Sequence, residues 1–378
     1  MRVLLVTNII SPHQMPLATK IVEIVGSENF RYVTTNPPSI DRVKLGWNLE
    51  ETAPWILRTK ECQKDKKTFE RWWDEADIVI SGVRRFRRMQ DRLNNKKLTF
   101  YMSERWWKPS IGLARLLHPR FALMTAHFVK LSHSPLFHYL PMGGLAAGDM
   151  QHIAAFKGRM WTWGYFTAAP QPLPTCERDG GNLRVLWAGR MLGWKRVDTL
   201  IKAFAKLQQA RSDAELTIVG DGPERSKLEK LAKEMLAIDS FQFMLPMPTV
   251  QVIELMKQHH IYVLPSNGYE GWGAVVNEAM SAGCTVIASS VAGSAKTMIS
   301  HGNNGLLFET GDHEQLANLL IQLNIDEEMR HRLATAGQRT MLDSWTPKIG
   351  ASRFISVCDA LLSHHPVPNY TDGPMAPV

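Results

Sequence analysis

The chain has 378 residues, of which 44% are hydrophobic and 21% charged, so it is long enough for about two or three globular domains and is neither disordered nor collagen-like. Its four cysteines stand far apart without a C-x-x-C pair, which argues against a structural zinc site or a disulfide framework. Residues 1–170 carry 25 Lys and Arg against 14 Asp and Glu, whereas residues 171–378 carry 19 against 22. The first half is therefore suited to an anionic partner: nucleic acid, a membrane surface or a phosphate-bearing substrate.

The sequence contains no long apolar segment. No run of about 18 apolar residues occurs, and the opening apolar run ends before Thr7, too early for a secretory signal. We therefore expect a cytoplasmic protein without a membrane span.

Short apolar runs alternate with longer amphipathic stretches, a pattern typical of α/β domains with parallel sheets. In the first domain, residues 1–166, the predicted strands are 3–6, 30–34, 78–80 and 99–102. Residues 167–182 are rich in Pro and Gly, which predicts a linker.

A second alternating series occupies residues 183–345. The predicted strands are 183–188, 214–219, 241–245, 261–264 and 285–288, with helices from Val197, from Glu224 and from about Ala274. Ligands of open α/β sheets bind beyond the carboxyl ends of the strands. We therefore expect contacts at residues 189–190, 220–222, 265–267 and 289.

The most specific segment is residues 265–283, in which a strand leads through a glycine-rich loop into a helix. Gly271 and Gly273 let phosphates approach the backbone at the helix start. Glu278 could accept hydrogen bonds from ribose hydroxyls, while Glu270 reaches the group beyond the phosphates. The alternative is an ordinary surface glutamate and a glutamate that interacts with the helix dipole.

Two cations, Arg190 and Lys195, follow the strand at 183–188. A departing diphosphate requires positive charge already in place, and arginine adds a forked geometry. The alternative is a solvated turn with a basic residue at the helix start. This alternative explains Arg196 better than it explains Arg190 and Lys195. The turn at residues 220–223 is weak evidence alone because such turns are common in α/β proteins.

Taken together, these motifs resemble the retaining glycosyltransferases of family 4, which have the GT-B fold of two Rossmann-like domains facing a central cleft. The resemblance rests on the E-x7-E pair Glu270 and Glu278, on Arg190 with Lys195, and on Gly220-Asp221-Gly222-Pro223. It implies a nucleotide-sugar donor, UDP- or GDP-linked, on the second domain, and no metal. The implied donor-binding residues are Gly189, Arg190, Lys195, Gly220, Asp221, Glu270, Gly271, Trp272, Gly273, Ala274 and Glu278.

The first half resembles a narrower set of family members, which assemble bacterial surface polysaccharides. The matching segments are residues 8–14, 101–106 and 163–166. The resemblance implies a glycan or lipid-diphosphate acceptor and a helix within residues 346–378 that crosses back to the first domain. We read that helix from Trp345 to about Ser363 and expect the following residues to be frayed.

In a front-face retaining mechanism the leaving phosphate helps to deprotonate the acceptor, so the catalytic groups are mainly Arg190, Lys195 and Glu270. No carboxylate pair is placed as in a glycosidase. His13 and Glu104 follow first-domain strands and are further candidates. The alternatives are a structural histidine and a glutamate that pairs with Arg105.

The basic segment 84–97 places Phe86, Met89 and Leu93 at helical spacing. It predicts a helix that packs this apolar stripe on the sheet with its charges in water. A functional interpretation adds attraction to an anionic inner leaflet, with residues 111–131 as an apolar contact or as buried core. We do not expect nucleic-acid binding, because no recognition helix or base-stacking motif is present.

We therefore expect a glycosyltransferase of the hexosyltransferase type, in peripheral contact with the inner face of the cell membrane. One rival is a sugar-nucleotide epimerase with the same fold. The other is a non-catalytic protein that binds nucleotide-sugars or polyanions. A Rossmann dehydrogenase is disfavoured because residues 3–16 contain no G-x-G-x-x-G.

Overall fold

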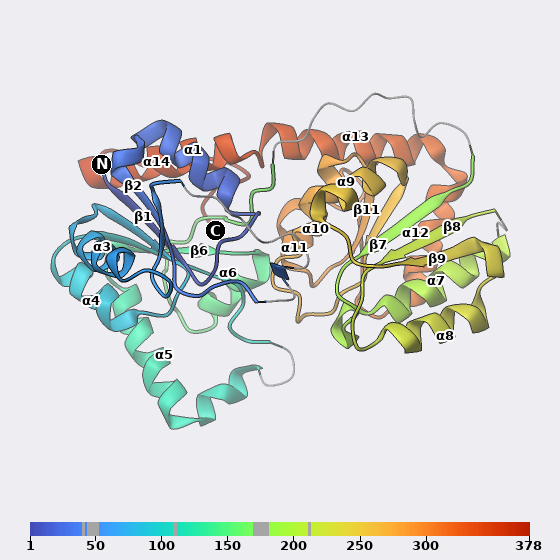
Figure 1. Ribbon diagram of the computed structural model, residues 1–378, viewed down its shortest axis with the longest axis horizontal. Coiled ribbons are helices and arrows are strands. Elements are labelled where there is room, and N and C mark those ends of the chain that lie inside the picture. The colour runs from blue at the N-terminus through green and yellow to red at the C-terminus, as the bar shows by residue number, and fades with distance from the viewer. Residues whose placement is uncertain (40–41, 44–52, 109–111, 169–180, 211–212) are drawn as a thin grey trace. The chain divides into compact units, whose positions relative to one another are not determined.

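The computed structural model describes residues 1–39, 42–43, 53–108, 112–168, 181–210 and 213–378. The chain divides into two compact units (Figure 1). The first unit comprises Met1–Ala168 and Ser344–Val378, and the second comprises Ala169–Asp343. Most of the predicted linker, residues 169–180, lies outside the described residues.

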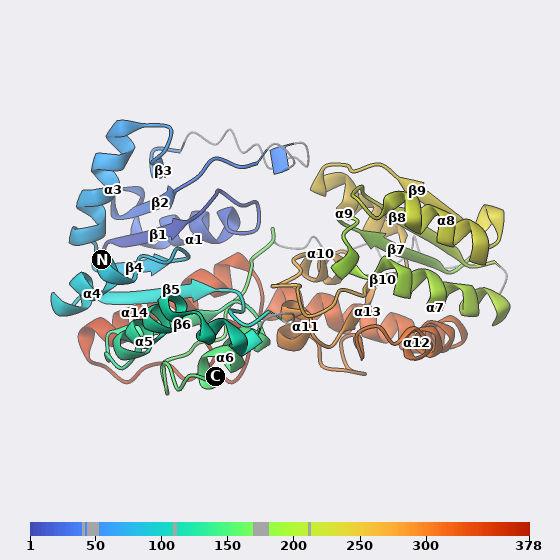
Figure 2. The same ribbon diagram turned by 90° about the horizontal axis from the view of Figure 1, so that it is seen from below.

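The first unit is built on a six-stranded parallel sheet in the order β3-β2-β1-β4-β5-β6 (Figure 2). Its strands are β1 (Val3–Thr7), β2 (Phe30–Thr34), β3 (Ile56–Arg58), β4 (Ile78–Ser81), β5 (Leu98–Ser103) and β6 (Phe137–Pro141). Its helices are α1 (Met15–Val25), α3 (Gln63–Glu75), α4 (Phe86–Asn94), α5 (Pro119–Ser132), α6 (Gly144–Gln151) and α14 (Pro347–Ser363), with short 3₁₀ helices η1 (Ser27–Asn29) and η3 (Gly112–Leu117). Every residue of β1 and β4 is buried, because helices cover both faces of a parallel sheet.

The second unit repeats this topology in the order β12-β11-β10-β7-β8-β9. Its strands are β7 (Arg184–Ala188), β8 (Glu215–Val219), β9 (Phe241–Met244), β10 (Ile261–Leu264), β11 (Thr285–Ser289) and β12 (Leu306–Phe308). Its helices are α7 (Val197–Ala210), α8 (Arg225–Met235), α9 (Thr249–Gln258), α10 (Val275–Ser281), α11 (Gly293–Met298), α12 (His313–Ile325) and α13 (Glu327–Asp343), with 3₁₀ helices η4 (Gly193–Lys195) and η5 (Ile238–Ser240). Counted from its own first strand, each unit has the doubly wound order 3-2-1-4-5-6.

All nine predicted strands are present, and three others were not predicted. β3 and β12 are only three residues long, and β6 contains His138 and ends at Pro141, so none of the three shows a clear apolar pattern. β6 is nevertheless fully buried between β5 and the segment that contains Met160. A polar residue is tolerated in this strand because the Trp161 indole donates a hydrogen bond to His138 Nδ1 at 3.0 Å and the His138 ring stacks on Phe100.

The carboxyl-terminal residues are ordered, so the expectation of a frayed tail was wrong. The amide of Met375 donates to the carbonyl of Thr162 at 2.8 Å, and the amide of Thr162 donates to Ala376 at 2.8 Å. Met375 is fully buried. The tail is held because the extended segment around Thr162 presents backbone groups that require partners.

Helix α14 belongs to the first unit and packs along α1. Its Phe354 ring lies 5.1 Å from that of Phe100 and 5.7 Å from that of Trp163. None of the helices in the described part of the chain is both long and apolar enough to cross a bilayer.

Helix α4 packs Phe86 and Met89 against the sheet as predicted, but one of its arginines is not in water. Arg92 is 2% exposed and donates hydrogen bonds to the carbonyls of Trp73, Ala76 and Leu98. Burial lowers the pKa of its guanidinium to about 10. Arg92 therefore ties α4 to the ends of α3 and β5 and does not contribute to a basic surface.

We predict that Arg92→Met lowers the free energy of unfolding of the first unit by about 3 kcal/mol, because several buried carbonyls lose their donor. Arg87→Met, at an exposed position of the same helix, should change it by less than about 0.5 kcal/mol. Urea denaturation followed by tryptophan fluorescence measures both changes. Equal stabilities of the two variants would contradict this role of Arg92.

Candidate functional site

The candidate donor site lies where the strand order of the second sheet reverses. β7 and β10 are neighbours in this sheet, and the loop after β7 carries Gly189 and Arg190 while the loop after β10 begins at Pro265. A crevice forms at such a reversal because the connections that follow the two neighbouring strands lead to opposite faces of the sheet. The amide of Asn267 donates to the carbonyl of Trp194 at 2.9 Å, so the two loops are joined directly.

An ion pair between Lys195 and Glu270 lies between these loops. The Lys195 ammonium donates to Glu270 Oε2 at 2.5 Å, and the two side chains are 14% and 8% exposed. The Ser266 hydroxyl donates to the same oxygen at 2.8 Å, and the Lys195 ammonium also lies 4.5 Å from the Trp194 ring centre. Two residues that are 75 positions apart in the sequence thus form one nearly buried unit.

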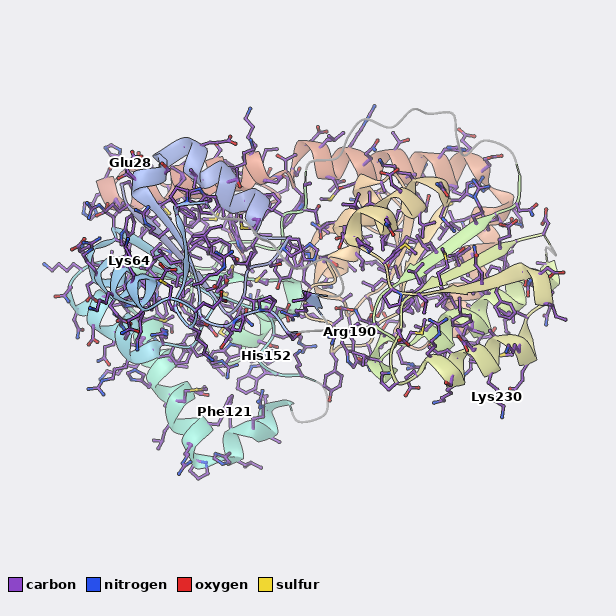
Figure 3. All side chains as sticks on the ribbon, viewed as in Figure 1. Glu28, Lys64, Phe121, His152, Arg190 and Lys230 are labelled. Atoms are coloured by element: carbon purple, nitrogen blue, oxygen red, sulfur yellow. The ribbon has the colours of Figure 1, made fainter. Side chains whose placement is uncertain are left out.

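Arg190 and Arg196 differ in their surroundings. The Arg190 side chain lies in the loop that follows β7 (Figure 3), is exposed, and makes no ion pair within the described residues. Arg196 donates to both carboxylate oxygens of Asp198, at 3.0 and 3.2 Å. Arg190 is therefore available to an anionic ligand, whereas Arg196 has a structural partner.

The turn at residues 220–222 supports the loop after β7. A Cβ atom on Gly220, whose φ is +139°, would lie 1.9 Å from the carbonyl oxygen of Gly189, so no other residue fits there. The amide of Met191 donates to the carbonyl of Asp221 at 2.8 Å. The Asp221 carboxylate accepts from the amide of Gly222 at 2.8 Å. The turn thus holds Gly189 and Arg190 in place.

The glycine-rich loop is held by contacts to its own unit. The Trp272 ring is buried and donates to Asn277 Oδ1 at 2.7 Å, so this side chain is part of the core. Gly271 and Ala274 flank the turn at Gly273, which has a φ of +84°, and its carbonyl accepts from the Ser294 hydroxyl at 3.0 Å. Helix α10 starts at Val275, one residue after the predicted start.

Glu278 lies in the first turn of α10 and is 5% exposed. Burial raises the pKa of its carboxyl group to about 8. The Tyr262 hydroxyl donates to the carbonyl of Ala188 at 3.0 Å, and its pKa is raised by burial and, to a smaller extent, by the nearby Glu278 and Glu270. Glu278 thus lies at the start of the helix that follows the loop after β10 and interacts with Tyr262 of that strand, so it belongs to the same reversal of strand order as Arg190 and Glu270.

The first unit has a cavity of about 380 Å³ at its own reversal of strand order, between the ends of β1 and β4. Its charged lining residues are Arg42, Arg84, Arg105 and Glu104. The Arg84 guanidinium lies 4.9 Å from the Trp106 ring centre. Three guanidinium groups and one carboxylate line the cavity, and even with Arg105 paired to Asp149 the positive charges outnumber the negative ones, which suits an anionic group.

Asp149 of α6 fixes the loop that carries Glu104 and Arg105. One carboxylate oxygen accepts from the amides of Trp106 at 2.6 Å and Trp107 at 3.0 Å, and the other lies 3.6 Å from the Arg105 guanidinium. Burial raises the pKa of Asp149, although these hydrogen bonds and Arg105 oppose the shift. The sequence offered no signal for this residue, because its partners are more than 40 positions away.

His13 and Glu104 both lie beside Tyr165. The rings of His13 and Tyr165 are 5.7 Å apart, and the Tyr165 hydroxyl donates to Glu104 Oε1 at 3.5 Å. Burial lowers the pKa of His13 to about 4, which leaves its imidazole neutral at pH 7. Tyr165 lies in the segment 163–166 that contributed to the family resemblance, but its position between the two candidates required the structure.

No group of three or more His, Cys, Asp or Glu side chains that could hold a metal ion occurs in the described part of the chain.

Comparison with known proteins shows that most of the second unit is similar to one protein family. Residues 177–340 match the family described as glycosyl transferases group 1. The chain is 31% identical over 163 residues to the N-acetyl-alpha-D-glucosaminyl L-malate synthase of Bacillus anthracis, a match that covers 43% of this chain and 42% of that protein. It is 30% identical over 174 residues to a GDP-mannose-dependent monoacylated alpha-(1-6)-phosphatidylinositol monomannoside mannosyltransferase of Corynebacterium glutamicum, covering 44% and 45%. The chain thus spans less than half the length of these relatives.

The fold of the whole chain is found in solved structures. The Anabaena protein HepE, crystallised with UDP, has a TM-score of 0.69 at 14% identity, with 96% of this chain and 100% of that chain covered. This likeness and the two doubly wound sheets confirm the predicted α/β class and the GT-B fold.

We predict that Glu278→Gln stabilises the second unit increasingly as the pH rises from about 5 to 8. Burial raises the pKa of Glu278 from the ordinary value of 4.5 for a glutamate to about 8 in the folded protein. Within this window the unfolded chain loses a proton that the folded chain retains, so the stability of the native protein falls. The isosteric amide has no such cost, and the difference should widen by up to about 1.4 kcal/mol per pH unit. Thermal unfolding of both proteins across the window measures it, and a constant difference would contradict the prediction.

Proposed function

We propose, from the match of residues 177–340 to the glycosyl transferases group 1 family, that this protein is a retaining hexosyltransferase that uses a UDP- or GDP-linked sugar. The acceptor is a glycan or a lipid-diphosphate-linked glycan in the assembly of a bacterial surface polysaccharide. The observation that carries the proposal is the grouping of Arg190, Lys195, Glu270 and Glu278 at the reversal of strand order in the second sheet.

The donor occupies the loops after β7 and β10. Arg190, exposed and without an ion pair in the described residues, binds the diphosphate together with Lys195. Glu278 accepts hydrogen bonds from the ribose, and Glu270 contacts the transferred sugar. UDP in the HepE structure and GDP-mannose in the name of the Corynebacterium relative support a nucleotide-sugar donor.

The Lys195–Glu270 pair suits this role. An ammonium group has three N–H donors, so Lys195 can remain bonded to Glu270 while it donates to a phosphate oxygen. The pair holds the cation in place before the donor arrives, and little reorganisation is required when charge develops on the leaving diphosphate. No metal is required for this step.

In the reaction, the bond between the anomeric carbon and the diphosphate oxygen breaks, and the acceptor oxygen bonds to the same face of that carbon. The proton of the acceptor hydroxyl passes to an oxygen of the leaving diphosphate. Arg190 and Lys195 stabilise the negative charge on that diphosphate. The neutral His13 imidazole and Glu104 orient the acceptor hydroxyl from the first unit.

The acceptor binds in the first-unit cavity. Its three guanidinium groups favour an acceptor that carries a phosphate, and the phosphatidylinositol-based acceptor named for the Corynebacterium relative supports a lipid-linked one. We infer that the protein acts in the cytoplasm in peripheral contact with the inner face of the membrane, where such acceptors are anchored. The basic first half supports this placement.

A donor-panel assay tests the proposed function. The protein is incubated with UDP- and GDP-sugars, with and without a lipid-diphosphate acceptor, and the released nucleoside diphosphate and the sugar products are identified. Acceptor-dependent release in the presence of a chelator is the expected result. An epimerised donor, or binding without turnover, would replace the proposal with an epimerase or a non-catalytic binding protein.

We predict that Arg190→Ala slows turnover. The activation free energy should rise by about 2.7 to 4 kcal/mol, which is the scale for the loss of one preorganised hydrogen-bond donor. Arg196→Ala is the matched control, because Arg196 lies in the same loop but bonds to Asp198. It should retain most of the activity. Steady-state kinetics and thermal unfolding are measured on both variants, and equal losses of turnover would contradict the assignment of Arg190.

We predict that Arg84→Gln raises KM for a phosphate-bearing acceptor by about tenfold or more, the effect of losing a charged hydrogen bond of about 1.5 to 3 kcal/mol. KM for the donor should not change. Arg87→Gln, an exposed position that does not line the cavity, is the control. Unchanged acceptor KM in the folded Arg84 variant would remove this residue from the acceptor site.

A further inference from the structure

The segment from Arg105 to Gly148 contains no Asp or Glu, although the chain as a whole has 36. It carries five Lys and Arg residues, which are Arg105, Lys108, Arg115, Arg120 and Lys130. This segment includes η3 and α5, which extend away from the sheet of the first unit (Figure 1). An acid-free, basic stretch that forms an outlying helix requires an explanation beyond packing.

The inner face of α5 is anchored by aromatic contacts. Phe128 is fully buried, with its ring 4.7 Å from that of Trp106. Phe121, labelled in Figure 3, lies 5.7 Å from the Trp107 ring. These contacts fix the orientation of the helix and determine which residues face outward.

The outer face combines apolar and basic side chains. Leu123 is 72% exposed. Arg120, three residues before it, and Lys130, seven residues after it, are also exposed and lie on the same face of the helix. On η3, Leu113 is 48% and Leu117 86% exposed. We call the surface of Leu113, Leu117, Arg120, Leu123 and Lys130 the α5 surface.

The basic cluster of α4 is much less available than its sequence suggests. Arg92 is buried, Arg88 pairs with Glu70 and lies over Trp73, and Arg85 lies over the Phe69 ring. Its apolar residues Phe86 and Met89 belong to the core. Exposed leucines and exposed cations therefore occur together on the α5 surface, whereas α4 exposes a cation, Arg87, but no large apolar residue.

We propose that the α5 surface docks the protein on an anionic lipid bilayer. This proposal rests on the proposed function, because it supplies the contact with the membrane that a lipid-linked acceptor requires. The leucines can insert below the lipid headgroups. The side chains of Arg120 and Lys130 are long enough to reach the lipid phosphates while the helix lies in that position. The absence of carboxylates along the whole segment removes repulsion from an anionic leaflet.

The test is co-sedimentation of the full chain with phosphatidylcholine vesicles, with and without phosphatidylglycerol. Leu117→Ser with Leu123→Ser, and Arg120→Glu with Lys130→Glu, alter the apolar and the basic parts of the α5 surface. Each pair should lower the partition coefficient on anionic vesicles by about tenfold or more, because the basic pair loses its attraction to the lipid phosphates and the leucine pair loses its apolar burial. Binding of the native protein to vesicles without phosphatidylglycerol should be weak.

Matched controls lie on the second unit. Ile238→Ser with Val250→Ser removes apolar residues that are 87% and 71% exposed, and Lys230→Glu with Lys233→Glu reverses two exposed charges. These variants should partition like the native protein. Thermal unfolding checks that all variants fold.

Equal partitioning of the native protein and the α5-surface variants, or an equal loss in the controls, would overturn the proposal. So would equal binding to neutral and anionic vesicles. Turnover on a soluble acceptor analogue separates this proposal from the proposed function. If the α5-surface variants keep that turnover and no longer bind anionic vesicles, docking through the α5 surface is supported. If the native protein binds anionic vesicles through the α5 surface but transfers no sugar from any donor, only the proposed function fails.

Discussion

The reversal of strand order beside the first strand of each sheet is the constraint on which both candidate sites depend. In the second unit it separates the loop after β7 from the loop after β10. The first loop carries the cations, and the second loop and its helix carry the carboxyl groups. The two loops are then joined by the hydrogen bond from Asn267 to Trp194 and by the ion pair between Lys195 and Glu270. In the first unit the same reversal, between β1 and β4, leaves the cavity lined by three arginines. The two sheets share this topology, and both sites follow from it.

The Lys195–Glu270 pair explains how the second-unit site can hold charge without a ligand. Each group alone would have a high desolvation cost at this depth, and the pair with the Ser266 hydroxyl offsets much of that cost. Removing one partner would leave the other buried and uncompensated. The pair therefore maintains a cation at the end of β7 and a carboxylate at the end of β10 in one fixed arrangement. Arg190, in the same loop as Lys195, is exposed and makes no ion pair with the residues that the structure describes.

In the first unit, one loop connects the cavity to the α5 surface. The residues after β5 place Glu104 and Arg105 at the cavity, and the next two residues, Trp106 and Trp107, contact Phe121 of α5. Asp149 holds this loop through two backbone amides. An acceptor phosphate in the cavity and a bilayer at the α5 surface would therefore be recognised by one loop and by the helix that this loop contacts.

The sequence alone was enough to predict the α/β class, nine of the strands and the positions of Arg190, Lys195, Glu270 and Glu278, because these depend on local periodicity and on fixed spacing within a strand and its following loop. β3, β6 and β12 were missed because short or polar strands carry little periodicity.

Only the tertiary structure decided which residues meet. It joined Lys195 to Glu270, buried Arg92, placed Tyr165 between His13 and Glu104, and ordered the tail against Thr162. Each of these outcomes depends on a partner that is distant along the chain. Burial and pairing are set by the packing of whole elements, and a sequence pattern reports only the local preference of each residue.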